Sequence, residues 1–550
     1  MTPVWTSNAG IRIHDLVPAV LRHEWVRQGL CPGRDLYSLF RDQVRAHPHR
    51  AAVIDRAGTV DYAALDRTAR HHAARLAELG LGERDIIAVR LPDGREAVAV
   101  ELAVAAVGAV ALPYPPGHGH SGPTRLLRRS RARALVVAEP CDAEFPRPLP
   151  HLEKILTTGE NSDPERSLAT PTAHRFVPRP VDPEAPARIL VSSGSEAEPK
   201  MVAYAHNAMA GGRAAYVRAL HDGSEPMRNL VLVPLGSSFG SLGTSVTVAA
   251  LGGTLVLPGA FDPATALRMC AEHRPTHVFG VPTMLRRLTE QPPLPDEDFS
   301  FLRALVSSGA ELPEATARTC RARFGCPVVT VYGSSDGVNC HTAATGLGPE
   351  TGTGLPDPAV ARIRIADASG RPVPDGEPGE ILARGPMTPL CYVASPELDA
   401  RYRTASGGWV RTGDRGMLDA HGRLHVLGRI KEIVVRGGFN ISPAEVEREL
   451  GAHPAVAEVC CVAVPDADLG ERMCACVRQP ATSPAVTLAE LTEFLEAERG
   501  LERRKLPELL LLVDRMPLGP TGKICRATLT GLAARQVATG RAGQVAEPAP

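Results

Sequence analysis

The stretch GRIKEIVVRGGFNISPAEVE (428–447) joins a basic turn, a short apolar strand, a double-glycine loop and the start of a helix. Downstream of it, helical and strand-like patterns alternate at 443–451, 456–466, 473–479 and 488–499. This alternation predicts a compact α+β domain at 431–535. The last residues, 536–550, have too little apolar content to fold and are expected to form a disordered tail.

Upstream of this stretch the chain alternates helical patterns with short apolar runs. LYSLFRDQVRAHP (36–48) and YAALDRTARHHAARLAELG (62–80) have helical spacing. Strand-like runs end at Gly, Ser or Pro, as in RILVSS, NLVLVPL, THVFGVP, ALVSSG and PVVTVYGSS. The loops after such strands can line a ligand crevice. The pattern predicts an α/β fold, with a large N-terminal domain of layered α/β subdomains at 1–430.

Two stretches of the large domain differ from this pattern. Residues 139–187 are richer in proline and charge and are expected to be a connecting stretch. Residues 358–430 have shorter strands with DG and HG turns, which is typical of a β-rich subdomain.

Composition excludes several classes of function. Formal net charge is zero and aromatic residues make up 4% of the chain, so nucleic-acid binding is not expected. The most apolar run, VAVELAVAAVGAVALP (98–113), carries Glu101 and is too short to span a bilayer, so no membrane insertion is expected. The twelve cysteines fit neither a zinc site nor a regular disulfide framework. A cytoplasmic enzyme with reduced thiols is therefore expected.

Lysine is scarce in this chain and is placed selectively. Only five of the 61 basic side chains are lysines, and three of them, Lys200, Lys431 and Lys523, lie in SSGSEAEPK (192–200), GRIKE (428–432) and PLGPTGK (517–523). A planar guanidinium cannot replace a compact ammonium that must reach one oxygen on a flexible stem. These three lysines are therefore candidates for phosphate chemistry.

The first of these motifs places a loop of small hydroxyl residues after an apolar strand, so its backbone amides and hydroxyls could grip a phosphate chain. A surface turn is the alternative. Further motifs follow in order, namely TVYGSSDG (330–337), RTGD (411–414), the stretch 428–447 and PLGPTGKICRATL (517–529). In this order and spacing the set resembles the ANL superfamily of adenylate-forming enzymes, over about residues 36–530.

The resemblance implies a large N-terminal domain, a small mobile C-terminal domain and a hinge at Lys431. It also implies two half-reactions. ATP and a carboxylate first give an acyl-adenylate and pyrophosphate; the small domain then rotates and a pantetheine thiol displaces AMP. Lys523 would bridge the carboxylate and the α-phosphate in the first half, where an ammonium offsets developing charge. Arg436, Gly437 and Gly438 would face the site in the second.

The same resemblance assigns the remaining site residues. Lys523, Arg429 and Asp336 are the expected catalytic residues. Asp414 would hold the ribose, and Tyr332 would stack near adenine. Simpler alternatives are a turn for Asp414, the core for Tyr332 and a hairpin for the glycines. The expected nucleotide- and CoA-binding set is Ser192, Ser193, Gly194, Ser195, Glu196, Lys200, Gly309, Ala310, Glu311, Tyr332, Gly333, Ser334, Ser335, Asp414, Arg429, Lys431, Arg436, Gly437 and Gly438.

The chain departs from the family pattern on the pyrophosphate side. The usual loop S-G-T-T-G-x-P-K-G is replaced by SGSEAEPKM, so that Glu196 stands where a hydroxyl usually faces phosphate. The glutamate that helps to hold Mg2+ is shortened to Asp336, the one expected metal ligand. Like charges a few ångströms apart cost on the order of 1 kcal/mol or more. The first half-reaction is therefore less secure than the second, unless Glu196 turns outward.

The expected substrate pocket includes PLGSSFG (234–240), with Ser237, Ser238, Phe239 and Gly240, and also Gly309 and Gly333. No aspartate is present there to anchor an α-ammonium, and the small residues leave space for a bulky acyl group. The leading interpretation is an acyl-CoA ligase that uses ATP, Mg2+ and coenzyme A. The alternatives are thioesterification of an adenylate supplied by a partner ligase, carrier-protein loading, and non-catalytic adenylate binding. A homo-oligomer is expected.

Overall fold

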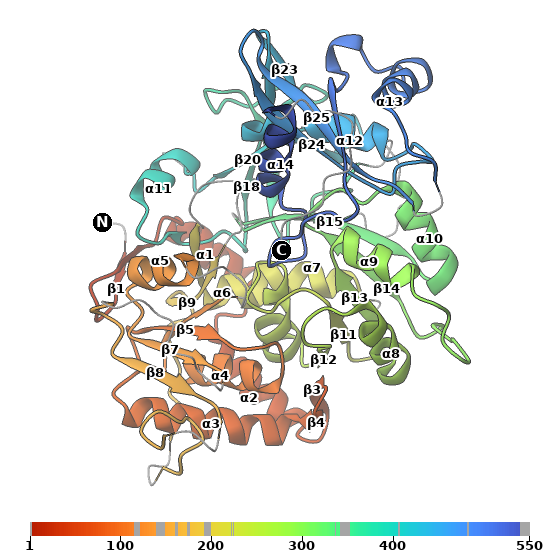
Figure 1. The fold of residues 1–550 in the computed structure, drawn as a ribbon. Coiled ribbons are helices and arrows are strands. Elements are labelled where there is room, and N and C mark those ends of the chain that lie inside the picture. Colours follow the sequence, from red (N-terminus) through yellow and green to blue (C-terminus); the bar gives the residue numbers. More distant parts are fainter. Residues whose placement is uncertain are drawn as a thin grey trace.

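The computed structural model describes residues 3–114, 121–138, 149–159, 163–172, 176–191, 200–221, 223, 225–335, 337–341, 352–404, 407–480 and 483–538. Two large sheets, a four-stranded sheet and a small C-terminal α+β unit make up this part of the chain (Figure 1). This architecture confirms the predicted α/β fold class with a small α+β C-terminal domain.

One large sheet has eight strands, of which the inner six run parallel and the two edge strands antiparallel. The apolar runs of the sequence form its centre, as expected for a sheet covered on both faces. Its order is β16 (Val338–His341), β15 (Val328–Ser334), β14 (Ala304–Ser308), β13 (His277–Gly280), β11 (Arg228–Val231), β12 (Thr254–Val256), β3 (Ala51–Asp55) and β4 (Gly58–Asp61).

The other large sheet has seven strands. Its inner strands are parallel, whereas β10 pairs antiparallel with both of its neighbours. The order is β19 (Cys391–Tyr392), β10 (Met201–Ala205), β9 (Pro186–Val191), β6 (Val110–Pro113), β5 (Ile86–Arg90), β7 (Ala134–Val137) and β8 (Lys154–Thr157). A separate short hairpin joins β1 (Val4–Thr6) to β2 (Arg12–His14).

The helices of the large domain start and stop where capping chemistry predicts. Asp35 and Asp61 accept backbone N–H bonds at the first turns of two of them. Gly325, at φ +63°, ends another. The helices are α1 (Ala19–Arg27), α2 (Leu36–Ala46), α3 (Tyr62–Glu78), α4 (Arg95–Ala106), α5 (Ser121–Ser130), α6 (His206–Ala208), α7 (Ala214–Ala219), α8 (Pro263–His273), α9 (Pro282–Thr289), α10 (Glu314–Phe324) and α11 (Pro396–Tyr402).

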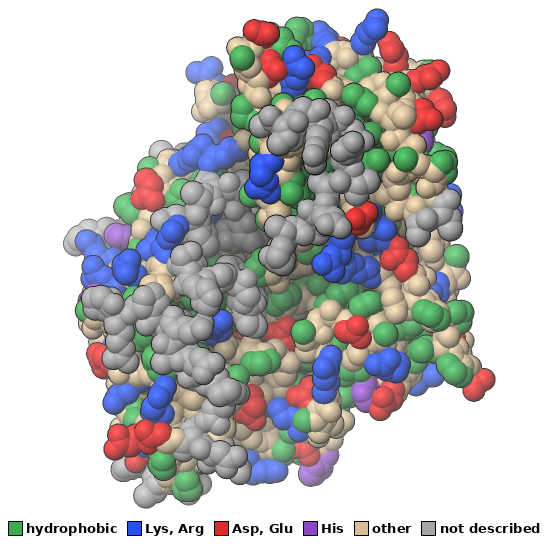
Figure 2. Space-filling view, in the orientation of Figure 1, with side chains coloured by type: hydrophobic (Ala, Val, Ile, Leu, Met, Phe, Trp, Pro, Cys, Tyr) green, Lys and Arg blue, Asp and Glu red, His purple; other side chains and the backbone are tan. Residues whose placement is uncertain are grey.

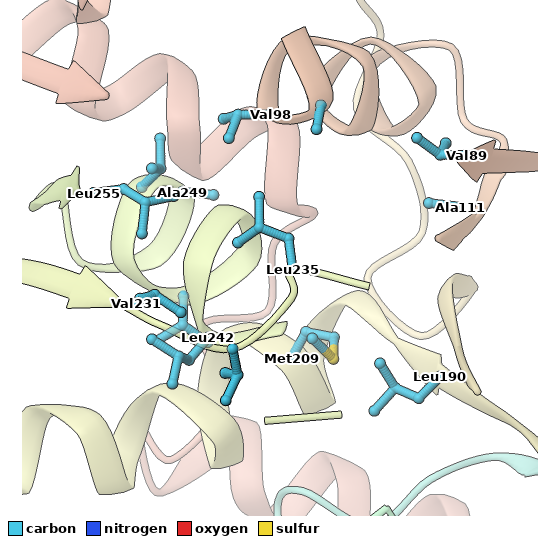
Figure 3. Packing of buried hydrophobic residues seen from close by; sticks show 14 of the residues in the cluster. Val89, Val98, Ala111, Leu190, Met209, Val231, Leu235, Leu242, Ala249 and Leu255 are labelled. Carbon is cyan, nitrogen blue, oxygen red and sulfur yellow. The ribbon is translucent and has the colours of Figure 1, made fainter. Parts of the chain in front are cut away.

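Three shorter helical turns lie beside them, the π-helical η1 (Met209–Arg213) and η3 (Gly243–Ala250) and the 3-10 turn η2 (Gly240–Leu242). One continuous apolar core joins these elements to both large sheets. Figure 3 shows Val98 of α4, Met209 of η1 and Leu242 of η2 within this cluster, with Leu190 of β9 nearby. The two large sheets therefore pack as one body.

The four-stranded antiparallel sheet confirms the β-rich region expected at 358–430. Its strands are β17 (Arg362–Ala366), β18 (Gly379–Arg384), β20 (Val410–Leu418) and β21 (Leu424–Arg429). The 3-10 turn η4 (Ile430–Glu432), which contains Lys431, leads from β21 into the C-terminal unit.

The C-terminal unit, drawn in blue in Figure 1, has its own two apolar clusters. Thr487 and Glu490 form a capping box at the start of its second helix. Its strands are β22 (Val434–Arg436), β23 (Phe439–Ile441), β24 (Glu458–Asp466), β25 (Gly470–Arg478) and β26 (Leu509–Leu512). Its helices are α12 (Pro443–Leu450), α13 (Leu488–Glu493), η5 (Phe494–Glu498), η6 (Arg503–Lys505) and α14 (Arg526–Ala538).

Two details differ from the sequence interpretation. The connecting stretch 139–187 contains a strand, β8, which extends the seven-stranded sheet at its edge. Helix α14 ends at Ala538 and so continues past the expected boundary at residue 535. Residues 539–550 lie outside the described residues.

The remaining fold findings concern membranes and thiols. Among the residues that the structure describes, none of the helices combines the length and the hydropathy that a bilayer crossing requires. The apolar run at 98–113 is divided between α4 and β6. All cysteines within the described ranges are free, and all except Cys525 are buried.

Candidate active site

A cavity of about 350 Å³ lies where the large sheets, the four-stranded sheet and the C-terminal unit meet. Val191, Val281, Ser308 and Ser334 line it from the carboxyl ends of strands, or directly after them. This is where an open α/β sheet offers a crevice to a ligand. The expectation that loops after these strands line the site is confirmed.

Lys523 enters this cavity from the C-terminal unit. The loop that carries it is closed by backbone bonds between Gly519 and Lys523 and between Cys525 and Pro517, and the Thr283 hydroxyl of α9 donates to the Gly522 carbonyl at 2.9 Å. The stem of Lys523 crosses Gly309, where a Cβ would stand 2.5 Å from Lys523 Cε. Gly309 has φ +92°, so the turn there both favours glycine and leaves room for the lysine.

Burial lowers the pKa of Lys523, and the positive charge of Arg429 lowers it further. Asp414 and Glu432 act in the opposite direction, because their carboxylates stabilise the ammonium. Lys523 still exposes part of its surface to solvent, and it is a cavity-lining cation whose charge depends on its surroundings. A negatively charged ligand in the cavity would favour the protonated form.

Asp414, Arg429 and Tyr332 form one hydrogen-bonded group beside Lys523. The register of β20 and β21 places Asp414 opposite Arg429, and Arg429 Nε lies 2.9 Å from Asp414 Oδ1. The Tyr332 hydroxyl of β15 donates to Asp414 Oδ2 at 2.6 Å. Burial, together with the Asp414 charge, raises the pKa of Tyr332 well above its ordinary value. The tyrosine is therefore a permanent donor to the carboxylate.

The lining is strongly cationic, which suits phosphate and carboxylate groups. Within the described residues it contains Lys200, Arg213, Arg401, Arg411, Arg429, Lys431 and Lys523. Its carboxylate, Glu380, lies 2.6 Å from Arg411. By contrast, acidic and basic side chains are interspersed on the outer face drawn in Figure 2. Positive charge is thus concentrated in the cavity of a chain whose formal net charge is zero.

Lys200 is held rigidly at this cavity. Its side chain is buried, and its Nζ lies 4.0 Å from the centre of the Tyr402 ring and 5.8 Å from that of Tyr392. Such cation–π contacts hold an ammonium without neutralising its charge. Lys431 approaches the same Tyr402 ring at 5.9 Å. Two of the three lysines singled out from the sequence therefore converge on one aromatic side chain.

The segment 234–240 supplies one wall of the cavity through Ser237, Ser238 and Phe239. Gly240 serves a different purpose, because a Cβ there would stand 1.9 Å from the Pro234 carbonyl oxygen. Gly240 therefore allows the chain to pack closely against Pro234, and it is not one of the residues that line the cavity.

Arg436, Gly437 and Gly438 form the turn between β22 and β23, with φ +55° and +84° at the two glycines. Gly437 and Gly438 are exposed in this turn, and none of the three residues lines the cavity. The structure therefore shows the arrangement in which Lys523 occupies the site and the double-glycine loop does not.

Apart from Gly240 and the turn at Arg436, Gly437 and Gly438, the expected residues fall into three groups. Those that line the cavity are Lys200, Ser237, Ser238, Phe239, Gly309, Gly333, Ser334, Ser335, Arg429, Lys431 and Lys523. In the second group, Asp414 forms an ion pair with Arg429, and Tyr332 donates a hydrogen bond to Asp414. Ala310 and Glu311, also in this group, follow Gly309 at an exposed turn. The third group, Ser192, Ser193, Gly194, Ser195, Glu196 and Asp336, lies outside the described residues.

The Mg2+ expectation rests on Asp336 and so falls outside the described residues as well. Within the described part of the chain, no group of three or more His, Cys, Asp or Glu side chains could hold a metal ion. Asp414 and Glu380 are each engaged by an arginine instead. The described residues therefore do not fit a metal site.

Sequence reasoning missed several lining residues, among them Arg213, Tyr216, Glu380, Tyr402 and Arg411. Arg411 begins the RTGD motif but was not assigned a role, and the others come from helices and strands that carry no recognisable motif. Tyr402, for example, is the last residue of α11. Lys200 and Lys431, whose ammonium groups approach its ring, are distant from it in sequence.

The fold and the site define a protein in which a lysine of the C-terminal unit enters a cation-lined cavity suited to phosphate and carboxylate groups. The profile of the AMP-binding enzyme family matches residues 40–393, and that of the AMP-binding enzyme C-terminal domain matches residues 445–523. The chain therefore belongs to the ANL superfamily of AMP-binding, adenylate-forming enzymes, which bind ATP and a carboxylic acid.

Individual relatives agree with this assignment. Triostin synthetase I of Streptomyces triostinicus is 34% identical over 532 residues, covering 94% of this chain and 98% of that protein. The 2-hydroxy-7-methoxy-5-methyl-1-naphthoate–CoA ligase of Streptomyces carzinostaticus is 31% identical over 533 residues, covering 92% and 94%. The amide bond synthetase McbA of Marinactinospora thermotolerans has a similar structure, with a TM-score of 0.78, 29% identity and coverage of 90% and 99%.

Proposed function

We propose that this enzyme is an acyl-CoA ligase that converts a bulky, non-amino carboxylic acid to its CoA thioester through an acyl-adenylate. The observation that carries the proposal is Lys523, an ammonium of lowered pKa whose stem lies over Gly309 in a cation-rich cavity. The wall at 234–240 supports the substrate class, since its lining residues include no carboxylate that would pair with an α-ammonium.

In the first half-reaction the acid's carboxylate oxygen attacks the α-phosphorus of ATP, and pyrophosphate leaves. Two anions must approach, and Lys523 would hold an oxygen of each and offset the repulsion. Arg429 would add positive charge at the α-phosphate, held in place by its bond to Asp414. Asp414 would accept the ribose hydroxyls with the lone pairs that Tyr332 and Arg429 leave free.

In the second half-reaction a thiol attacks the acyl carbon and AMP leaves. For this step the C-terminal unit would turn about Lys431 in η4, withdrawing Lys523 and bringing the exposed turn at Gly437 and Gly438 to the cavity. The absence of side chains at both glycines would leave a path for a pantetheine arm. The present arrangement fits the first half-reaction.

Carrier-protein loading is the second candidate, because a carrier presents the same pantetheine thiol as CoA. The names of the relatives give different acceptors: a CoA ligase in one case and an amide bond synthetase in another. An acceptor panel of CoA, a phosphopantetheinylated carrier protein and simple amines separates these possibilities. We expect CoA to give the highest rate.

Glu196 raises a further alternative, in which the enzyme only thioesterifies an adenylate supplied by a partner ligase. Restoring the usual chemistry with Glu196→Thr and Ala197→Gly distinguishes the cases. If Glu196 faces the pyrophosphate, the double substitution raises acid-dependent pyrophosphate release, and each tenfold corresponds to about 1.4 kcal/mol of barrier. An unchanged rate from an already active enzyme shows that Glu196 turns outward.

The direct test supplies purified enzyme with a library of acids, ATP and CoA, and detects AMP esters and thioesters by mass spectrometry. A ligase gives both products. A thioesterifying enzyme gives thioester only from supplied adenylate. A non-catalytic adenylate-binding protein gives neither product from any acid or adenylate, and that result would overturn the proposal.

A further inference from the structure

Among the described residues, one buried cation in the cavity wall has no carboxylate partner. Arg213, which is 3% exposed, lines the cavity beside Ser238. Its Nη1 donates to the Ser238 carbonyl at 2.8 Å and to Ser241 Oγ at 2.9 Å, and its Nη2 donates to Ser238 Oγ at 3.2 Å. Nε is buried and has no acceptor within the described structure. One hydrogen of Nη2 and the Nε hydrogen are therefore unassigned.

The neighbouring buried arginine, Arg188, differs from Arg213 in having a carboxylate partner, although its Nε also has no acceptor among the described residues. Arg188 Nη1 lies 2.6 Å from Glu101 Oε2, and both side chains are almost fully buried. Its Nη2 donates to the Leu235 carbonyl at 2.6 Å. Burial lowers the pKa of Arg188, and the charge of the nearby Arg213 lowers it further. Within the described residues, Arg188 therefore has a carboxylate partner and Arg213 has only neutral acceptors.

A buried charge without a partner is costly, and folded proteins normally pair it. Arg213 is nevertheless fixed where it stands. It ends the π-helical segment η1, and such bulges often occur at functional sites. Gly212 on the same segment packs so closely that a Cβ would stand 2.2 Å from the Met387 nitrogen. The guanidinium also lies 5.2 Å from the centre of the Tyr204 ring. The fold thus holds at the cavity a cation that no carboxylate of the described residues pairs with.

Arg213 lies apart in the chain from the residues assigned to the reaction. Lys523 and Arg429 come from the C-terminal loop and from β21, whereas Arg213 is hydrogen-bonded to Ser238, in the wall assigned to the acyl group. A ligand group that meets Arg213 would therefore be a substituent of the acid and not its reacting carboxylate.

We propose that the acid carries a second anionic group, of the carboxylate class, and that Arg213 binds it. This inference rests on the proposed function, because it concerns the acid that the enzyme activates. A carboxylate would accept the second N–H of Nη2 and supply the missing charge. Arg213 is thereby the specificity-determining residue of the acyl pocket.

The test compares acids in matched pairs, namely straight-chain monocarboxylic and dicarboxylic acids of equal carbon number, and benzoic acid with the benzenedicarboxylic acids. Adenylation is followed by acid-dependent pyrophosphate release, and binding of each acid is followed by titration calorimetry. We expect at least one dicarboxylic acid to be preferred over its monocarboxylic counterpart by at least about tenfold in kcat/KM. Arg213→Met should abolish or reverse that preference, and Arg213→Lys should retain part of it.

Ser241→Ala is the matched control, because it removes a hydrogen bond between Arg213 and the wall but leaves the guanidinium in place. If Arg213 only supports the wall, Arg213→Met and Ser241→Ala change the rates with all acids alike, and the proposal is overturned. A preference for neutral hydroxy acids, or no preference for any dicarboxylic acid, also overturns it. If no acid gives pyrophosphate or an AMP ester, the proposed function fails, and calorimetry with the same pairs still decides the role of Arg213.

Discussion

Substituting Gly309 with alanine should slow adenylate formation by displacing Lys523. The added Cβ would stand 2.5 Å from Lys523 Cε and 2.9 Å from Nζ, whereas ordinary contact begins near 3.4 Å. The ammonium must therefore retreat by roughly 1 Å, and a displacement of that size at a reacting centre can cost about 100-fold in rate. This corresponds to about 2.7 kcal/mol of barrier. The positive φ of Gly309 adds strain that affects stability.

The two half-reactions are measured separately, as pyrophosphate release from acid and ATP and as thioester formation from supplied adenylate. Gly325→Ala is the control for backbone strain, because Gly325 also has positive φ but no atom within 4 Å of its added Cβ. In a Lys523→Ala background, Gly309→Ala should cause little further loss of adenylation. A further 100-fold loss in that background, or equal loss of both half-reactions, would refute the reasoning.

Three further predictions concern the alternation of the two arrangements. Lys523→Ala should abolish adenylation while leaving most thioester formation from supplied adenylate. Desolvation and the charge of Arg429 lower the pKa of Lys523, so wild-type adenylation should decline at a lower alkaline pH than an ordinary lysine would allow. A pH–rate profile of each half-reaction checks this. Glu458→Gln removes a partly buried ion pair between the domains, in which Arg286 Nη2 of α9 lies 2.8 Å from Glu458 Oε1 of β24. The ratio of the adenylation rate to the thioesterification rate should then fall by about tenfold. An unchanged ratio would show that this ion pair does not hold the domains in the adenylating arrangement. Gly438→Trp should impair thioesterification and spare adenylation, with Gly438→Ala as the control for strain at the same φ of +84°; equal rates for both variants would mean that the loop is only a hairpin.

The fold class could be predicted because its signals are local. Alternating periodicities and turn residues identified the α/β layers, the β-rich region and the C-terminal unit. Sheet order could not be predicted in the same way, because it depends on contacts between distant segments. Strand β3 (Ala51–Asp55), for example, pairs with β12 (Thr254–Val256), about 200 residues away. No local pattern encodes that pairing.

The site was predictable in proportion to how rare its residues are in this chain. Lysine is scarce, so Lys200 and Lys523 stood out and both line the cavity. Arginine supplies most of the 61 basic side chains, so Arg213 and Arg286 could not be distinguished from the rest. Their importance comes from burial and from the presence or absence of a partner carboxylate, which only the folded structure reveals.

Pyrophosphate release by the wild-type enzyme, measured over an acid library with ATP and no thiol, tests the central claim most directly. The account predicts release that depends on a particular acid, accompanied by the matching AMP ester, and conversion of that ester to a thioester when CoA is added. Thioester formation from supplied adenylate, without pyrophosphate from any acid, would contradict it.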